Sequence, residues 1–339
     1  MSRSQTSRKK KPVALVTSVG GALAYKTAIE LAKDHELVGL STRPLRPGLP
    51  FPGTLVQVRH YAQRGVAEVF RQHRPDVVVH SGSLPSQVRD PGRRFTDNVL
   101  GTRNILELAT KYGARKAVVQ STFHVYGAVH TNHVHITEDE PLRAAQTFPQ
   151  IADVVEMDHA ATTYLWQHQE METVVLRFAN MVGPTLRNFI SRTLRRSRVP
   201  RLLGYDPVMQ FVHEDDAVAA QALAARSPGR GVYNVAGEGA CAWSWAIRHA
   251  GAPYVSVPHI VAIPLVALLF RARGVMLPEH LIDYFRYPVI IDDQRFRGRR
   301  AGGERHARQQ DSAKEGGDRA DYLHPAFAQA ASAVLKSPP

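Results

Sequence analysis

The first half of the chain alternates short, apolar, β-rich runs with longer stretches of helical periodicity. Strands that are separated by helices pair in parallel, through crossover connections. We expect strands at residues 13–17, 36–40, 55–58, 76–80, 117–120 and 173–177, and helices at 22–33, 65–73, 98–111 and about 153–167. This order predicts an α/β fold with a doubly wound parallel sheet of the Rossmann type.

The pattern changes after Gly183 and Pro184, where the expected elements become shorter and mixed. We expect an arginine-rich helix from about 187, a strand near 209–212, a helix at 214–225, a strand at 232–235, and helical pieces at 242–249 and 260–270. The chain therefore divides into a Rossmann domain at 12–183 and a smaller C-terminal lobe at 184–296. The tails at 1–11 and 297–339 are rich in charged and small residues, and we expect them to be disordered.

The formal charge of +13 would suggest a polyanionic partner, but the basic residues are concentrated in three segments. Residues 1–11 hold five basic side chains and no acid, and residues 187–201 hold six arginines and no acid. Residues 295–319 hold eight basic side chains against four acidic ones, so the rest of the chain sums to −2. We therefore expect no nucleic-acid partner.

Cysteine content and hydropathy favour a protein of the cytoplasm. Cys241 is the only cysteine, which excludes an intrachain disulfide and fits a reducing compartment. The longest apolar run covers residues 260–270 and contains Pro264, and it is too short to span a bilayer. We expect no transmembrane segment.

The turn after the first strand has some of the features of a dinucleotide-binding turn. Three positions spaced three apart, where such a turn carries glycines, hold Ser18, Gly21 and Ala24. Gly20 and Gly21 would let the backbone approach a pyrophosphate. A plain glycine-containing turn between a strand and a helix is the competing interpretation.

The end of the second strand indicates which dinucleotide the turn would bind. Ser41, Thr42 and Arg43 stand where an acidic residue would hold the ribose of NAD. Two hydroxyls and a guanidinium suit a 2′-phosphate, so we expect NADP or NAD, with NADP favoured. The competing interpretation is a solvated loop.

Five motifs occur in a characteristic order along the chain: DNVLGT at 97–102, VQSTFHVYG at 119–127, LRFANMVGP at 176–184, FVHEDD at 211–216 and YNVAG at 233–237. Together they resemble the extended short-chain dehydrogenase/reductase family, in particular its atypical epimerase/dehydratase group. The resemblance covers about residues 12 to 295. It implies an NAD(P)-binding protein that acts on a hydroxyl or carbonyl carbon of a nucleotide sugar or similar phosphorylated substrate.

The resemblance also implies roles for single residues. Thr122 matches the family's Ser or Thr that hydrogen-bonds the reacting oxygen, and Asn180 matches the asparagine that contacts substrate. Asn98 matches the helix asparagine near the active site, and we assign it to the cofactor site together with Gly82, which follows the fourth expected strand. Thr122, Asn98 and Asn180 could each instead be ordinary polarity at the end of a strand or helix.

The chain departs from the family at the Tyr-x-x-x-Lys pair, whose lysine makes the tyrosine a proton acceptor near neutral pH. Anchoring on Glu156 places Phe148 and Ala152 at these two positions, and neither side chain can exchange a proton. Tyr112 and Lys116 also have this spacing, but they lie at the wrong end of a strand for the site.

Two functional hypotheses follow from this departure. In the first, the chain is an oxidoreductase or isomerase with an atypical active site, in which His124 or Tyr126 acts as a relocated proton carrier. Asp153 is a further nearby candidate. In the second, the chain is a catalytically inactive nucleotide-binding sensor or scaffold of the same fold.

The arginine-rich segment is the expected substrate clamp. Arg187, Arg192 and Arg196 follow the motif at 176–184, and Arg192 can share one helix face with Arg195 or Arg196, which lie three and four residues further on. Guanidinium groups suit diphosphates, although a solvated basic helix would look the same in sequence. We expect a small-molecule substrate and consider a homodimer as the assembly. His130, His133 and His135 lack a regular metal-ligand spacing, so we expect no metal site.

Overall fold

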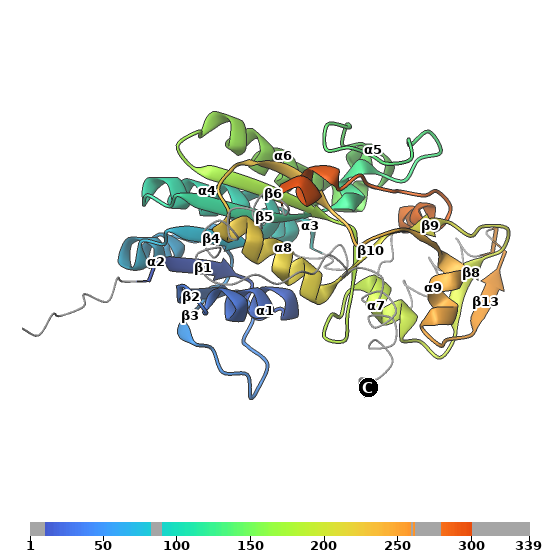
Figure 1. Cartoon of the computed structure of the whole chain (residues 1–339), viewed down its shortest axis with the longest axis horizontal. Helices are drawn as coiled ribbons and strands as arrows, with labels where there is room; N and C mark the ends of the chain where they lie inside the picture. The colour runs from blue at the N-terminus through green and yellow to red at the C-terminus, as the bar shows by residue number, and fades with distance from the viewer. Residues whose placement is uncertain (1–10, 83–89, 259, 262–278, 300–339) are drawn as a thin grey trace, which may run out of the picture.

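The structure is a computed structural model that describes residues 11–82, 90–258, 260–261 and 279–299. Its centre is a seven-stranded sheet in which all neighbouring strands are parallel (Figure 1). In spatial order the strands are β11 (Gly231–Val235), β6 (Glu172–Phe178), β5 (Lys116–Thr122), β4 (Val77–His80), β1 (Val13–Thr17), β2 (Glu36–Ser41) and β3 (Gly53–Gln57). The order reverses between β1 and β4, which confirms the predicted doubly wound sheet.

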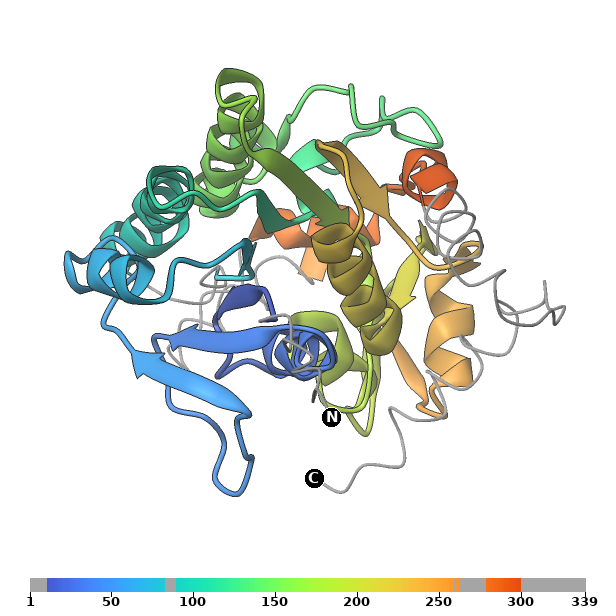
Figure 2. The same cartoon turned by 60° about the vertical axis from the view of Figure 1, so that its left-hand side comes forward.

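Helices cover both faces of the sheet (Figure 2). One face packs against α1 (Ala22–Leu31) and α8 (Glu214–Arg226), and the other against α2 (Gly65–His73), α4 (Gly101–Lys111) and α6 (Ala152–Gln167). The central strands are buried on both sides, which explains why they are continuous apolar runs in the sequence.

The predicted and observed elements of this domain agree closely, with one local exception. The helix predicted at 98–111 starts one turn late, because Thr96–Leu100 form a π-helical turn (η1) that continues the short helix α3 (Pro91–Phe95). The side chains of Asp97 and Asn98 therefore lie on a wider turn and are both buried.

The smaller lobe consists of paired short strands and two helices beyond the carboxyl edge of the sheet. The strand pairs are β7 (Asn180–Val182) with β10 (Phe211–His213), β9 (Val208–Met209) with β12 (Cys241–Ala242), and β8 (Val199–Leu202) with β13 (Tyr254–Val257). The helices are α7 (Phe189–Leu194) and α9 (Trp243–His249), and the lobe is centred on the buried ring of Trp243.

The strand predicted near 209–212 is thus split between β9 and β10, and the arginine-rich helix is only six residues long. The helical piece predicted at 260–270 lies outside the described residues beyond 261, as do the predicted tails at 1–10 and 300–339. Residues 297–299 were also predicted to be disordered, but they belong to a helical turn at 294–299.

After the lobe, the chain returns across the first domain. The 3-10 helix η4 (Glu279–Phe285) packs against the 3-10 helix η2 (Phe123–Tyr126), the helix α5 (Ala144–Thr147) and the 3-10 helix η3 (Pro149–Ile151). Ile291 then forms a β-bridge with Ile136, and Phe296 is buried in the core beside α8. This return segment (279–299) connects the lobe with the sheet.

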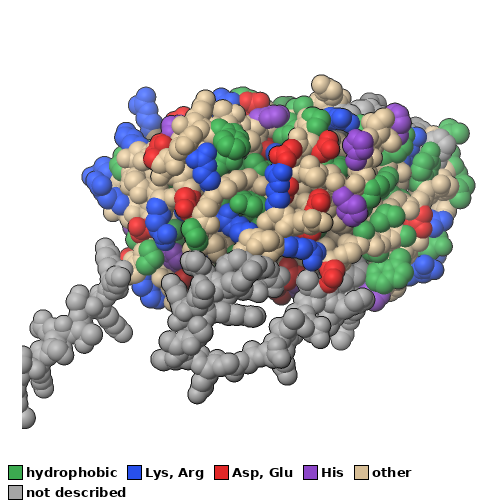
Figure 3. Space-filling view, turned by 45° about the horizontal axis from the view of Figure 1, so that its top comes forward, with side chains coloured by type: hydrophobic (Ala, Val, Ile, Leu, Met, Phe, Trp, Pro, Cys, Tyr) green, Lys and Arg blue, Asp and Glu red, His purple; other side chains and the backbone are tan. Residues whose placement is uncertain are grey.

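The surface carries both signs of charge. In Figure 3 the blue and red side chains of the described residues are interspersed across the visible face. Within the described ranges, no helix has the length and apolar character that a membrane span requires.

Candidate active site

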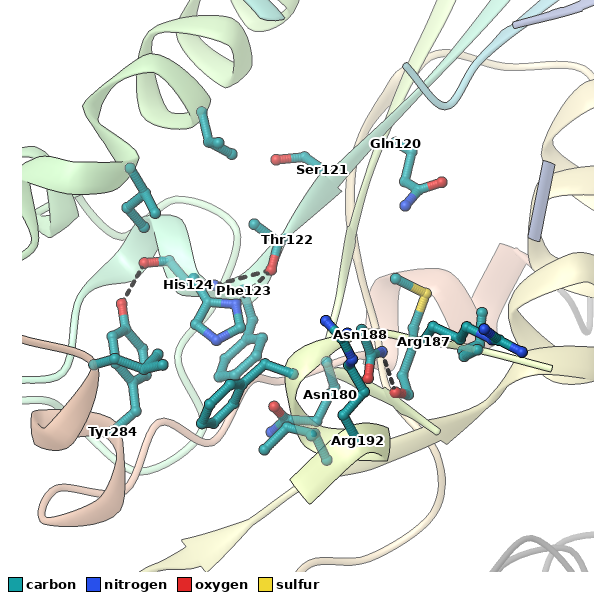
Figure 4. Close-up of a pocket in the computed structure, with 18 of the residues that line it drawn as sticks. Gln120, Ser121, Thr122, Phe123, His124, Asn180, Arg187, Asn188, Arg192 and Tyr284 are labelled. Carbon is teal, nitrogen blue, oxygen red and sulfur yellow. Dashed lines mark hydrogen bonds between the residues drawn. The ribbon is translucent and has the colours of Figure 1, made fainter. Parts of the chain in front are cut away.

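A cavity of about 760 Å³ opens at the carboxyl edge of the sheet, between the first domain and the lobe. Three parts of the chain that are far apart in sequence supply its walls. They are the turn at Gly20 and Gly21, the end of β5 from Gln120 to His124, and the lobe around Asn180 and Arg192. Figure 4 shows the side chains from Gln120 to His124 opposite those of Asn180 and Arg192 from the lobe.

The turn after β1 is shaped by the close approach of the loop that follows β2. A Cβ added to Gly20 would lie 2.7 Å from the carbonyl oxygen of Arg43, and the amide of Gly20 donates to Oγ of Ser41. Ser18 adopts a left-handed conformation with φ 59°. Its hydroxyl lies 2.8 Å from that of Tyr61, so a hydrogen bond holds the serine where a glycine was expected.

The other predicted cofactor residues lie at different depths around this turn. Arg43 lines the cavity, whereas Thr42 faces a second cavity of about 530 Å³ beside Asp97. Ala24 belongs to α1 and is buried in the core. Gly82 lies against the ring of Tyr61, where a Cβ would be 2.5 Å from the ring. Nδ2 of Asn98 donates to the carboxylate of Asp153 at 2.5 Å, inside the protein.

Thr122 and His124 form a hydrogen-bonded pair on the cavity wall. Thr122 Oγ1 lies 2.8 Å from Nδ1 of His124, and the ring of Tyr284 lies against the imidazole at 4.8 Å (Figure 4). The hydroxyl of Tyr284 donates to the carbonyl oxygen of His124 at 2.6 Å. Removal from bulk water lowers the pKa of the His124 imidazole to about 4, so the ring is neutral near pH 7.

Tyr126 does not line this cavity, although the sequence made it a candidate proton carrier. Its hydroxyl donates to Oδ1 of Asn234 and accepts from the guanidinium of Arg177, which is paired with the buried carboxylate of Asp158. Burial raises the pKa of Tyr126 to about 12. These contacts hold the Tyr126 hydroxyl inside the protein, against side chains of β6 and β11.

Phe148 and Ala152 are placed differently with respect to the cavity. The ring of Phe148 lines it and lies 5.9 Å from the ring of Tyr284. Ala152 starts α6 and does not belong to the lining. The next residue, Asp153, pairs with Asn98 and lies 3.7 Å from Arg94.

Four arginines line the cavity, and its described lining includes no Asp or Glu: they are Arg43, Arg46, Arg187 and Arg192. Arg196 is not part of this lining, because α7 ends at Leu194 and Arg196 is exposed outside the cavity. The guanidinium of its neighbour Arg195 instead donates to the carbonyl oxygens of Gly183, Pro184 and Leu186.

Sequence reasoning missed several side chains that shape the site. The buried amide of Gln221 on α8 accepts from Thr27 and donates to Ser81 and to Gln120 in the cavity wall. The carboxylate of Glu214 binds the amides of Thr185 and Leu186 and the ammonium of Lys26. Their partners are far away in sequence, so no local pattern could have indicated them.

Comparison with known proteins places this architecture in a family. The model of the NAD dependent epimerase/dehydratase family matches residues 15–236. The chain belongs to this family.

An uncharacterized protein of Mycobacterium tuberculosis is 30% identical over 237 residues, which are 68% of this chain. The match spans 62% of the mycobacterial protein's own length. A dTDP-glucose 4,6-dehydratase of Streptomyces griseus is 31% identical over 48% of this chain and 51% of its own.

Among solved structures, the UDP-glucose 4-epimerase of Thermus thermophilus in complex with NAD has a TM-score of 0.66 at 23% identity, covering 84% of this chain and 92% of its own. The enzyme WbmG of Bordetella bronchiseptica, in complex with NAD and UDP, has the same TM-score at 18% identity, covering 86% and 88%. These likenesses confirm the fold of this epimerase/dehydratase family member.

Proposed function

We propose that the chain is an NAD(P)-dependent enzyme that acts on a phosphate-bearing substrate of the nucleotide-sugar type. Three features support this. Gly20 and Gly21 bring backbone without side chains to the cavity wall, four arginines line the cavity with no Asp or Glu in its described lining, and Thr122 faces the same cavity. Solved relatives of the same fold carry NAD together with UDP or a UDP sugar. Bound NAD(P) supplies the hydride acceptor or donor.

The observation that carries the proposal is the 2.8 Å contact between Thr122 and His124 in the cavity. Anchoring on Glu156 assigns Phe148 and Ala152 to the positions of the family's Tyr and Lys, and on this assignment another group must take the proton. We infer that a substrate hydroxyl gives its proton to Thr122 Oγ1 while the Thr122 proton moves to Nδ1 of His124. A neutral imidazole can accept that proton, and the reverse transfer serves carbonyl reduction.

The loop after β2 supports NADP as the preferred cofactor. Arg43 and Arg46 line the cavity next to the turn at Gly20, and Arg43 follows a strand end without an acidic residue. A guanidinium matches the geometry and charge of a 2′-phosphate, which NAD lacks.

A catalytically inactive sensor is the second candidate. The low pKa of His124, about 4, makes the imidazole a weak base, and Phe148 fills its part of the wall with an unreactive ring. Such a protein would bind the same ligands without chemistry.

Two measurements test these functions. Native mass spectrometry of the purified chain, with calorimetric titration of NADPH and NADH, reports cofactor binding, and its absence refutes both candidates. Nicotinamide fluorescence during incubation with UDP-glucose or dTDP-glucose then reports hydride transfer. We expect a change that Thr122→Val and His124→Phe abolish, while His130→Phe, at an exposed loop position, has no effect. Binding without any hydride transfer supports the sensor.

A further inference from the structure

The two sides of the cavity differ in chemistry. In Figure 4, Tyr284 and His124 lie on one side, and Arg187 and Arg192 come from the lobe across from them. The wall around Thr122 and His124 is made of apolar side chains. They come from the residues just before α6, from α6 itself and from the return segment: Phe148, Ile151, Met157, Leu281, Phe285 and Val289.

Several polar side chains of the lining are already committed to the protein. Nδ2 of Asn188 donates to the carbonyl oxygen of Met181, and its Oδ1 accepts from the amide of Ser191. Oε1 of Gln120 accepts from Gln221, and the Tyr284 hydroxyl donates to the His124 backbone. The pair of Thr122 and His124 is therefore left to make most of the polar contacts with a ligand at this side.

A hexose ring would be poorly matched to such a wall. Each hydroxyl that is taken out of water without a new partner lowers affinity, whereas a hydrocarbon gains affinity from the burial of apolar surface. One hydroxyl or carbonyl, at the reacting carbon, is matched by Thr122 and His124.

We propose that the reacting group of the substrate is hydrocarbon-rich and joined to a phosphate or diphosphate. The head group lies against Arg187 and Arg192, and the apolar part lies along α6 and the return segment. This inference rests on the proposed function for the position of the reacting carbon, and it narrows the preferred substrates to phosphates or diphosphates whose reacting group carries fewer hydroxyls than a hexose. Hydride transfer itself is unchanged.

Two matched pairs of ligands test the preference in calorimetric titrations of the full chain without dinucleotide. Geranyl diphosphate is compared with inorganic pyrophosphate, and UDP-glucose is compared with UDP. We expect the geranyl chain to increase affinity at least about tenfold and the glucose to add less than about twofold. A geranyl chain that adds nothing, or a glucose that adds tenfold or more, would overturn the proposal.

A pair of variants tests where the apolar part of the ligand binds. Val289→Thr keeps the side-chain shape but adds a hydroxyl to the apolar wall, and we expect it to weaken geranyl diphosphate binding about three- to tenfold. Val69→Thr on α2 is the control, because both valines are 6% exposed and Val69 does not line the cavity. Equal effects of the two variants on binding would contradict the assigned wall.

The NADPH titration of the same samples is a separate readout. If NADPH fails to bind while geranyl diphosphate binds as expected, the proposed function is refuted and the ligand preference stands. If NADPH binds and geranyl diphosphate does not, the ligand preference is refuted and the proposed function stands.

Discussion

The imidazole of His80 is buried at the carboxyl end of β4, and its hydrogen bonds fix one tautomer. Thr102 donates its hydroxyl proton to the carbonyl oxygen of Asn98, so it must accept from Nε2 of His80 at 2.9 Å. Thr17 accepts from the amide of Ser81 and donates to Nδ1. Burial lowers the pKa of His80 to about 4, and the neutral ring thus links β1, β4 and α4.

This burial predicts a pH dependence of stability. The folded-state pKa of His80 lies below the unfolded value of about 6.5, so its contribution is complete above pH 6.5 and is lost as the pH falls toward 4. Between pH 7.5 and pH 5 the free energy of unfolding should fall by about 2 kcal/mol through this residue. Urea unfolding at pH 7.5 and at pH 5 measures this difference in the free energy of unfolding. His80→Gln should reduce the difference, while the exposed His130→Gln leaves it unchanged.

Cofactor selectivity gives a second test on a single side chain. Arg43→Ala should weaken NADPH binding about tenfold or more, because a charge-assisted contact with the 2′-phosphate is lost, and it should change NADH binding little. Fluorescence titration with both cofactors measures the ratio, and NADH is the internal control. An equal loss for both would show that Arg43 does not contact the 2′-phosphate.

The sequence motifs predicted the positions of those candidate site residues that lie together at the end of one strand. Thr122 and His124 are two residues apart at the end of β5, so one motif placed both at the carboxyl edge. The position of Tyr126 was decided by Asn234, Arg177 and Asp158, which contact it from other elements. Tyr284 lies 160 residues from His124, and nothing near it in the sequence indicates the contact.

The short helix α7 shows how an element can be predicted while its orientation is not. The sequence indicated an arginine-rich helix, but Asn188 caps α7 and the helix ends after six residues. Arg192 therefore reaches the cavity, Arg195 turns back to the loop at 183–186, and Arg196 points to solvent. Helical periodicity alone could not distinguish these three side chains.

Arg195 donates to carbonyl oxygens of this loop and Glu214 accepts from its amides, and the loop leads directly to Arg187. We expect Arg195→Ala to increase amide hydrogen exchange at residues 183–188 about tenfold or more, because three carbonyl oxygens lose a charged donor. UDP binding should weaken in the same variant. Arg196→Ala removes the same charge from the next residue, which is exposed, and it should change neither the hydrogen exchange nor UDP binding. If both variants behave alike, the effect is general electrostatics and not positioning of the loop.

Considered as a whole, the molecule is held together by the return segment. Tyr284 lines the cavity, the ring of Phe285 lies 5.3 Å from the ring of Trp243 in the lobe, and Phe296 packs beside α8 and Tyr233. Arg299 adds hydrogen bonds to the carbonyl oxygens of Ser227 and Pro228. The alternation of strands and helices predicted the sheet, but these contacts join elements that no local pattern relates.

This arrangement predicts that the lobe and the sheet unfold together. The chain has three tryptophans, and Trp166 on α6 is the one outside the lobe, so fluorescence of a Trp166→Phe variant reports the lobe alone. Its urea transition should coincide with the transition followed by far-UV circular dichroism, which reports all helices and strands. Phe296→Ala in that background should lower the free energy of unfolding by about 3 kcal/mol and move both transitions equally, since it removes a buried ring. A lobe transition that precedes the dichroism change, or that is unmoved by Phe296→Ala, would show that the return segment does not couple the two parts.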